Sequence, residues 1–410
     1  MKIRLARVYR RYEMITAQFN DSFPPIADGV ALGVKNYALW LNRKYGRAYA
    51  VVPEFPGYTD DEEFPVIRYK SIPYYPRKPY RIGLHGISFE AKRILSDISL
   101  DIVHARTPFS SGAFAHQIAR EKNIPIVATF HSQYYYDIKE QVLSETITRG
   151  LLKRIADFYE STDAVWTVNN KTAATLREYG YRGDIDIMGN GTDFKMPANY
   201  EKIRAVVGRE YNIKPCEFML MYTGQLVWHK NLRLIVEGLH EIKRKGHAFK
   251  MFFIGKGDAE AELIELIQQL DLRENVILTG QIDNRTKLRD LYARSDLFLF
   301  PSIYDTFGIV VREAAALKTP CVLVAGSNAS EGIEDMVNGF LCKNDTESFA
   351  GKIMEIMENP ELLASVADRA MRTIPESWEQ IVDRAYSKYE DIIRDYSIRK
   401  NSRSIYRNPF

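Results

Sequence analysis

Two carboxylates frame a turn and a predicted helix in the segment PSIYDTFGIVVREAAALKTP, residues 301–320. Asp305 stands just before the Thr-Phe-Gly turn at 306–308, and Glu313 follows Asp305 after eight residues. A helix is predicted to begin near the glycine and to end before Pro320. The free backbone N–H groups of its first turn then suit a phosphate or the hydroxyl oxygens of a sugar. The structural alternative is a capped helix, in which Asp305 is an N-cap-type residue. Glu313, further along the helix, either faces solvent or, in a binding role, accepts hydrogen bonds from a diol.

Three further candidates follow predicted buried strands, and each of them alone is a weak signal. Lys230, in YTGQLVWHKNL, is by itself an ordinary surface lysine. His131 stands at the carboxyl edge of the run IVATF, where a lone histidine is more often structural or exposed. Gly29, in FPPIADGVALGVKNYALWL, forms a glycine turn before an amphipathic helix. Their chemistry depends on the elements that bring them together.

Short apolar runs bounded by Gly, Pro, Asn and Asp recur along the chain and alternate with amphipathic helical patterns such as 231–245 and 261–270. Runs this apolar are typical of strands buried on both faces of a parallel sheet. The alternation predicts an α/β protein with two doubly wound, Rossmann-like parallel-sheet domains. Ligands bind such folds in the crevice at the carboxyl ends of the strands. The expected strands are 13–19, 48–52, 101–105, 125–130, 164–168 and 184–188, then 218–224, 250–255, 275–280, 296–301, 321–326 and 339–342.

Composition narrows the class of protein. With 410 residues, 46% of them hydrophobic and 27% charged, the chain suits two or three ordinary folded domains. A net charge of +3 is too small to favour nucleic acid as a partner. The three cysteines, Cys216, Cys321 and Cys342, are far apart and indicate a reducing compartment. Glu13 and Gln18 interrupt the basic N-terminus before a signal-peptide core, and no apolar run reaches about 18 residues. We therefore expect a cytoplasmic protein without a transmembrane helix.

One stretch of the first half is strongly charged and aromatic. The acidic run DDEE at 60–63 precedes the basic segment IRYKSIPYYPRKPYRIGLHG at 67–86. A charge run of this kind is usually a solvated loop. The alternative is a surface that meets anionic lipid or an anionic acceptor, which would make the protein peripheral on the inner face of the membrane.

The segment 301–320 resembles the Glu-x7-Glu signature of the family-four retaining glycosyltransferases, whose fold is the two-domain GT-B type. The resemblance runs through PS, FG, the second acid and EAAALKTPCVL, and it departs where Asp305 stands in place of the first glutamate. In that family the first acid and the following amides hold the donor sugar, and the second acid, here Glu313, holds the ribose diol of the nucleotide. The loop before the helix and the helix itself would thus bind both the sugar and the ribose of one nucleotide-sugar.

Other motifs extend the resemblance over roughly residues 14–390. YTGQLVWHKNL is similar to the family's diphosphate loop, with Lys230 as its lysine but with the uncharged Gln225 in place of its arginine. FPPIADG is similar to the family's Pro-Pro-x-x-Gly-Gly loop, in which only the second glycine remains and Asp28 replaces the first. The resemblance implies that His131 touches the transferred hexose. The implied donor-binding residues are Gly29, Gln225, Lys230, Thr306, Phe307, Gly308 and Glu313, and the implied catalytic residues are His131, Lys230 and Asp305.

The acceptor side is predicted from the first domain. Asp28 would repel a diphosphate, so we expect it to face an acceptor hydroxyl, and Tyr134 and Tyr135 to shape the acceptor pocket. The resemblance implies an N-terminal acceptor domain at 1–196 and a donor domain at 197–375. Residues 376–410 are expected to form a helix that crosses back to the first domain, with a loose basic tail from residue 397. SIPYYPRKPYR and TFHSQYYYD are similar to segments of bacterial members that glycosylate membrane lipids.

The resemblance implies a retaining hexosyltransferase that moves a sugar from a UDP- or GDP-hexose to a lipid or glycan acceptor. Asp184 and Asp186 spell an Asp-x-Asp metal motif of another fold, but they lie in a predicted strand, so we expect no metal site and no further cofactor. The departures at Asp28, Gln225 and Asp305 keep a second hypothesis open, a catalytically silent scaffold subunit. A nucleotide-sugar epimerase of related fold is a third.

Overall fold

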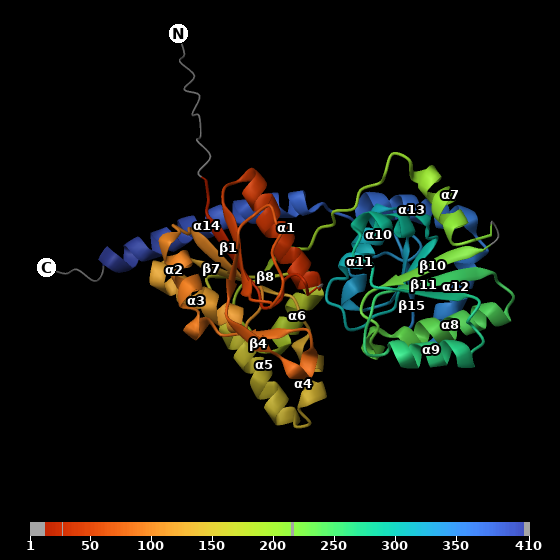
Figure 1. Ribbon diagram of the computed structural model, residues 1–410, viewed down its shortest axis with the longest axis horizontal. Coiled ribbons are helices and arrows are strands. Elements are labelled where there is room, and N and C mark those ends of the chain that lie inside the picture. Colours follow the sequence, from red (N-terminus) through yellow and green to blue (C-terminus); the bar gives the residue numbers. More distant parts are fainter. Residues whose placement is uncertain (1–12, 27, 215–216, 406–410) are drawn as a thin grey trace, which may run out of the picture.

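The computed structural model describes residues 13–26, 28–214 and 217–405, and within them two parallel sheets, each covered by helices (Figure 1). The strands of the first sheet are β1 (Thr16–Phe19), β2 (Ala48–Pro53), β3 (Val66–Tyr69), β6 (Ile102–Ala105), β7 (Ile126–Phe130), β8 (Ala164–Thr167) and β9 (Asp186–Ile187). The strands of the second are β10 (Phe218–Thr223), β11 (Phe249–Ile254), β12 (Val276–Gly280), β13 (Leu297–Phe300), β14 (Cys321–Val324) and β15 (Phe340–Cys342). The predicted fold class, two doubly wound α/β domains, is confirmed.

Helices connect the strands in the expected alternation. In the first half they are α1 (Gly29–Lys44), α2 (Phe89–Asp97), α3 (Ser110–Lys122), α4 (Tyr134–Gln141), α5 (Glu145–Glu160) and α6 (Asn170–Glu178). In the second half they are α7 (Tyr200–Glu210), α8 (Leu232–Arg244), α9 (Glu260–Gln269), α10 (Arg285–Arg294), α11 (Ile309–Ala316), α12 (Thr346–Met357), α13 (Pro360–Thr373) and α14 (Trp378–Ile405). None of the helices in the described ranges combines the length and the hydropathy needed to span a bilayer.

The strand orders place two crevices. The first sheet runs β3-β2-β1-β6-β7-β8-β9 and the second runs β12-β11-β10-β13-β14-β15. In the first sheet, the strands before β6 are added on one side of β1 and the later strands on its other side. In the second sheet, the same change occurs between β10 and β13. Such a switch point opens a crevice at the carboxyl ends of the two strands. The loops that follow β10 and β13 carry Gln225, Lys230 and Asp305, so the topology gathers these three candidates at one edge of the second sheet.

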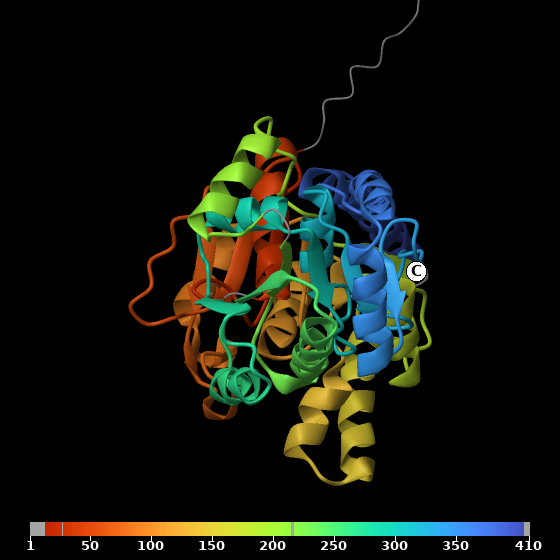
Figure 2. The same ribbon diagram turned by 90° about the vertical axis from the view of Figure 1, so that its right-hand side faces the viewer.

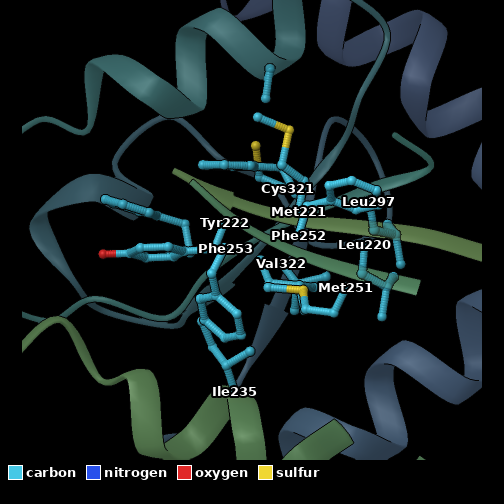
Figure 3. Close-up of a cluster of buried hydrophobic side chains, with 14 of the residues drawn as sticks. Leu220, Met221, Tyr222, Ile235, Met251, Phe252, Phe253, Leu297, Cys321 and Val322 are labelled. Carbon is cyan, nitrogen blue, oxygen red and sulfur yellow. The ribbon is translucent and has the colours of Figure 1, made fainter. Parts of the chain in front are cut away.

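The second domain is built around a large apolar core (Figure 3). Its central strands β10 and β11 are paired in register from Phe218 opposite Phe249 to Thr223 opposite Ile254. Leu220, Met221 and Phe252 are completely buried, because helices cover both faces of the sheet and each side chain of a strand therefore meets apolar neighbours. A core of this size fixes the strand ends from which the site loops start.

The last helix joins the two domains. Figure 1 shows α14 leaving the second domain and running along the first. Its first turns bury Trp378, Ile381 and Tyr389 in one cluster with α1 and the first sheet, which confirms the predicted crossing. The tail expected to be loose from residue 397 is instead helical as far as Ile405, because α14 continues beyond its buried part. Residues 406–410 lie outside the described residues.

The segment predicted as a solvated loop is folded. Val66–Tyr69 forms β3 at the edge of the first sheet, and β4 (Ser71–Pro73) pairs antiparallel with β5 (Arg81–Gly83). A one-turn helix, η1 (Tyr75–Arg77), lies at the tip of this β4–β5 hairpin. The sequence misled because strands of three or four residues are too short to show a visible alternation.

The domain boundary predicted at 196/197 falls in the connection between β9 and α7. The backbone N–H of Thr192 donates to the carbonyl oxygen of Glu376 over 2.8 Å, so the two crossings of the chain between the sheets lie side by side. Residues 1–12, which begin the basic N-terminus, and Cys216 lie outside the described residues. Cys321 and Cys342 are buried free thiols.

Candidate active site

The loop 301–308 and the start of α11 form the centre of the site. Gly308 has a φ of +65° and is the N-cap of α11, so the helix begins where the sequence predicts. A Cβ at Gly308 would lie 3.1 Å from the Val311 side chain and 3.2 Å from Cβ of Ala329, so glycine suits both the backbone angle and the space. Within the described ranges, no hydrogen bond uses the backbone N–H of residues 306–308. Three donors therefore remain at the helix start.

Lys230 and Asp305 meet in this site. The Lys230 ammonium forms an ion pair with Oδ1 of Asp305, and the side chains are only 13% and 21% exposed. The structure thus brings together two candidates that are 75 residues apart in sequence. Oδ2 of Asp305 is buried and has no hydrogen-bond partner among the described residues. It can accept a hydrogen bond from a ligand hydroxyl while Oδ1 stays paired with Lys230.

His131 approaches the same loop from the first domain. Its carbonyl oxygen accepts a hydrogen bond from the Thr306 hydroxyl over 2.5 Å. The imidazole is buried, and Nε2 finds no partner in the part of the chain that the structure describes. Burial, and secondarily the charge of Arg106, holds the pKa of His131 well below its usual range. The ring is therefore neutral near neutral pH and offers an uncharged hydrogen-bonding group beside the loop.

Thr306 and Phe307 also form contacts between the two domains. The carbonyl oxygen of Thr306 accepts a hydrogen bond from Nδ2 of Asn169 over 2.8 Å. A Cβ at Gly189 would lie 3.3 Å from the Phe307 ring, and that ring stacks under the Arg312 guanidinium at 4.1 Å. The side chains of this turn are thus used for domain contact, which leaves its backbone amides as the groups that can meet a ligand.

Glu313 is enclosed by protein and does not face solvent. The residue is 2% exposed, and it accepts hydrogen bonds from Nη2 of Arg285 over 2.7 Å and from the hydroxyl of Tyr292 over 3.3 Å. Arg285 also pairs with Asp193. Burial raises the pKa of Glu313, and the charge of Arg285 opposes the rise. The solvent-facing alternative for Glu313 is wrong, because α11 packs this side chain against α10.

Arg285, Tyr292 and Asp193 were missed from the sequence. Asp193 belongs to the motif GNGTD, which is similar to a family motif but has the residue types of a structural turn. Arg285 opens a helix with an ordinary charged pattern, and only the packing of α10 beside α11 shows that it faces Glu313.

The loop before α1 differs from the prediction. Asp28 was expected to face an acceptor hydroxyl, but it is the N-cap of α1: Oδ1 accepts from the backbone N–H of Ala31 over 2.7 Å. Oδ2 accepts from the hydroxyl of Tyr80 over 3.2 Å. Helix starts leave N–H groups without partners, and a carboxylate one residue before the helix satisfies them. Gly29 faces the other domain, since a Cβ there would lie 3.5 Å from Ile309.

The tyrosine run after β7 is also used differently. Tyr134 is buried and packs edge-to-face against Phe130, with ring centroids 5.7 Å apart. The hydroxyl of Tyr135 donates to Glu145 of α5 over 3.4 Å. These contacts place Tyr134 in the core and direct Tyr135 along α5, in place of the predicted acceptor pocket. The third tyrosine of the run, Tyr136, contacts Tyr304 of the second domain, with centroids 5.8 Å apart.

The Asp-x-Asp match of the sequence is a structural feature. Asp186 lies in β9 and forms an ion pair with Lys388 of α14 over 2.7 Å. It therefore helps α14 to dock on the first sheet.

Comparisons with known proteins agree with this geometry. Glycosyltransferase Family 4 matches residues 27–195, and Glycosyl transferases group 1 matches residues 207–373. An alpha-monoglucosyldiacylglycerol synthase of Streptococcus pneumoniae is 24% identical over 396 residues, which cover 93% of this chain and 87% of that protein.

Solved structures agree in fold. Sucrose-phosphate synthase of Thermosynechococcus elongatus aligns with a TM-score of 0.78 and 22% identity over 93% of this chain and 100% of its own. HepE of Anabaena, solved in complex with UDP and glucose, aligns with a TM-score of 0.73 and 18% identity over 92% of this chain and 100% of its own.

The two family descriptions follow each other along the chain, one for each parallel sheet, and the solved structures share the arrangement of both sheets. The membership expected from the motifs is confirmed: the chain belongs to the family-four glycosyltransferases of the GT-B fold.

Proposed function

We propose that the protein is a retaining hexosyltransferase that moves a sugar from a nucleoside-diphosphate donor, held by the second domain, to a lipid or glycan acceptor held by the first. One observation carries the proposal. Three backbone N–H groups at 306–308 lie beside the Lys230–Asp305 pair, and Nε2 of His131 and Oδ2 of Asp305 are buried next to them; none of the five has a hydrogen-bond partner among the described residues. Buried polar groups without partners are costly in free energy. The phosphate of a nucleotide-sugar would accept hydrogen bonds from the backbone N–H groups, and its sugar hydroxyls would bond to His131 and Asp305.

The chemistry follows from which groups surround the reacting atoms. The bond between C1 of the hexose and the diphosphate oxygen breaks, and the acceptor oxygen bonds to C1 from the same face. The proton of the acceptor hydroxyl passes to the departing phosphate oxygen, so charge and atoms balance. Lys230 and the amides at 306–308 stabilise the leaving diphosphate, while His131 and Asp305 orient the sugar hydroxyls.

The nucleotide site extends toward Glu313. A ribose diol needs acceptors for two hydroxyl protons, and Glu313 is the acid of the site that lies on α11 itself. HepE of Anabaena was solved with UDP, which makes a uridine donor the first one to try.

A donor screen tests this function. At a hundred times its Kd, a ligand that binds the folded state should raise the melting temperature by roughly 5 to 10 °C. We expect UDP or GDP to do so, and the matching hexose donor to be hydrolysed slowly without acceptor. If neither nucleotide binds in calorimetry, the enzyme reading fails and the scaffold hypothesis gains. If the donor alone is converted to a donor with a different hexose, the protein is an epimerase.

For the acceptor, we propose a membrane-bound lipid, with the protein cytoplasmic and peripheral on the inner face. A relative from Streptococcus pneumoniae is named alpha-monoglucosyldiacylglycerol synthase. Exposed apolar residues gather on the first domain: Ile72, Tyr75 and Ile82 on the β4–β5 hairpin, and Leu143, which is 95% exposed, with Ile147 where α4 meets α5. Figures 1 and 2 show α4 and α5 extending beyond the rest of that domain. Such residues suit insertion at a lipid interface.

Vesicle sedimentation tests the membrane contact. The protein should sediment with vesicles containing phosphatidylglycerol at low salt and less so at moderate salt. Leu143→Asp should weaken this binding by about tenfold or more, since a buried leucine contributes roughly 2 kcal/mol. Val206→Asp, at an exposed valine of α7 in the other domain, is the matched control. Equal and salt-insensitive sedimentation with neutral and anionic vesicles would remove the membrane proposal but not the donor proposal.

A further inference from the structure

We propose that Arg77, at the tip of the β4–β5 hairpin, binds the donor diphosphate and supplies the positive charge that is absent at Gln225. This inference rests on the proposed function. It assigns to the first domain a part of the donor site that the second domain lacks.

The need for a second cation arises from the loop after β10. Gln225 occupies the position at which an arginine would face the diphosphate, and an amide donates hydrogen bonds but carries no charge. Lys230 is already paired with Asp305. A diphosphate that gains charge as it leaves therefore meets one ammonium group whose charge is partly neutralised, and its stabilisation calls for another cation.

The tip of the hairpin lies over this loop. The hydroxyl of Tyr80 donates to Asp28 over 3.2 Å, and the side chain of Gln225 lies beside that hydroxyl. Tyr80 thus touches both domains at the mouth of the crevice. The Arg77 guanidinium lies 5.3 Å from the centroid of the Tyr80 ring. One aromatic ring therefore separates the charge of Arg77 from the amide of Gln225.

A second aromatic ring connects Arg77 to Lys230. Nη1 of Arg77 donates to Oδ1 of Asp137 over 2.9 Å, and the hydroxyl of Tyr304 donates to the same oxygen over 2.7 Å. The ammonium of Lys230 lies 5.6 Å from the centroid of the Tyr304 ring. The two cations thus both lie close to Tyr304, one from each domain: Lys230 near its ring and Arg77 near its hydroxyl through Asp137.

Arg77 has the freedom that the role requires. Its side chain is 41% exposed, and Asp137 takes only part of the five N–H donors of a guanidinium. The remaining donors can meet phosphate oxygens, and a planar guanidinium binds phosphate in bidentate geometry. Because Tyr304 and Gln225 belong to the second domain, a diphosphate bound to Arg77 and Lys230 would also hold the two domains together.

The rival explanation is a purely structural role, in which Arg77 only stabilises the contact between Asp137 of α4 and Tyr304 of the second domain. The two roles differ in what they do to different ligands. Loss of a structural contact would change the Kd of nucleoside and nucleoside diphosphate equally. Loss of a phosphate-binding cation would change only the Kd of the nucleoside diphosphate.

The experiment compares wild type with Arg77→Ala, Arg77→Gln, Gln225→Arg and the double variant Arg77→Ala/Gln225→Arg. Calorimetry measures Kd for UDP and GDP and for uridine and guanosine, and thermal melting checks that each variant is folded. Lys78→Ala is the matched control, because the adjacent Lys78 is exposed and its ammonium lies over the Tyr75 ring of the hairpin itself.

Arg77→Ala and Arg77→Gln should weaken binding of the nucleoside diphosphate by about tenfold and leave the nucleoside unchanged. Gln225→Arg should restore the binding in the double variant, since it returns a guanidinium beside Tyr80. Unchanged diphosphate affinity in folded Arg77 variants, or an equal loss for nucleoside and diphosphate, would overturn the inference. If wild type binds neither UDP nor GDP, the proposed function itself has failed.

Discussion

Lys230→Ala should lower the rate of sugar transfer by about 10²–10³-fold, the effect usual for removing one group that stabilises developing charge. The ammonium of Lys230 is the cation of the second domain that lies against Asp305 and next to the free amides of residues 306–308. Its loss leaves the departing diphosphate with the neutral Gln225, the helix start and the proposed contact with Arg77. The measurement is kcat and kcat/KM for transfer or, before an acceptor is found, the rate of donor hydrolysis.

Two further measurements locate this effect. Lys245→Ala removes an exposed lysine at the C-terminal end of α8, remote from the site loops, and should leave the rates unchanged. Thermal melting separates chemistry from folding, because Lys230→Ala leaves the Asp305 carboxylate without its partner. A Lys230→Ala enzyme that is folded and retains its full rate would exclude Lys230 from the leaving-group site.

Arg285→Ala should lower the free energy of unfolding by about 3 kcal/mol, the lower end of the range for breaking a buried ion pair. The reason is that Glu313, 2% exposed, would keep only the hydroxyl of Tyr292 as a partner. The effect lies at the lower end because the Arg285 side chain itself is 38% exposed. Arg289→Ala, which removes the pair with Asp290 one turn further along α10, is the matched control. Urea denaturation measures the difference.

The pH dependence of this loss has a definite sign. Burial raises the folded-state pKa of Glu313 above its unfolded value, and Arg285 opposes the rise, so Arg285→Ala should raise that pKa further. A carboxyl with a raised folded-state pKa stabilises the fold below its unfolded pKa, and that stability is lost as pH rises through the folded pKa. The variant should therefore be less destabilised at about pH 5 than at about pH 8. A deficit that grows toward acid would show that Glu313 is not the group left unpaired.

The same variant reports on the nucleotide. If Glu313 binds the ribose diol, the further rise of its pKa in the variant favours the protonated carboxyl, which is a weaker hydrogen-bond acceptor than the carboxylate. Uridine and UDP should then both bind more weakly to Arg285→Ala, in contrast to the diphosphate-specific loss expected for Arg77→Ala.

Several features of this protein were already present in its sequence. Strands β10, β11 and β14 are apolar at every position that two helical layers bury, so their location and parallel pairing can be predicted from local composition. The start of α11 at Gly308 follows from a positive φ that glycine favours. The motif residues identified the family because the loops that follow β10 and β13 always meet at the switch point of such a sheet.

Other features depended on how distant segments meet. The sequence shows Asp305 and Lys230 as two free side chains, and only the convergence of two loops pairs them. Asp28 became a helix cap in contact with Tyr80, and Glu313 acquired Arg285, because α1 and α10 present these groups to neighbours that lie far away along the chain. Burial periodicity is a local property that each strand or helix carries in its own residues. The partner of a charged side chain is instead set by the docking of whole elements and domains, and no single segment encodes that docking.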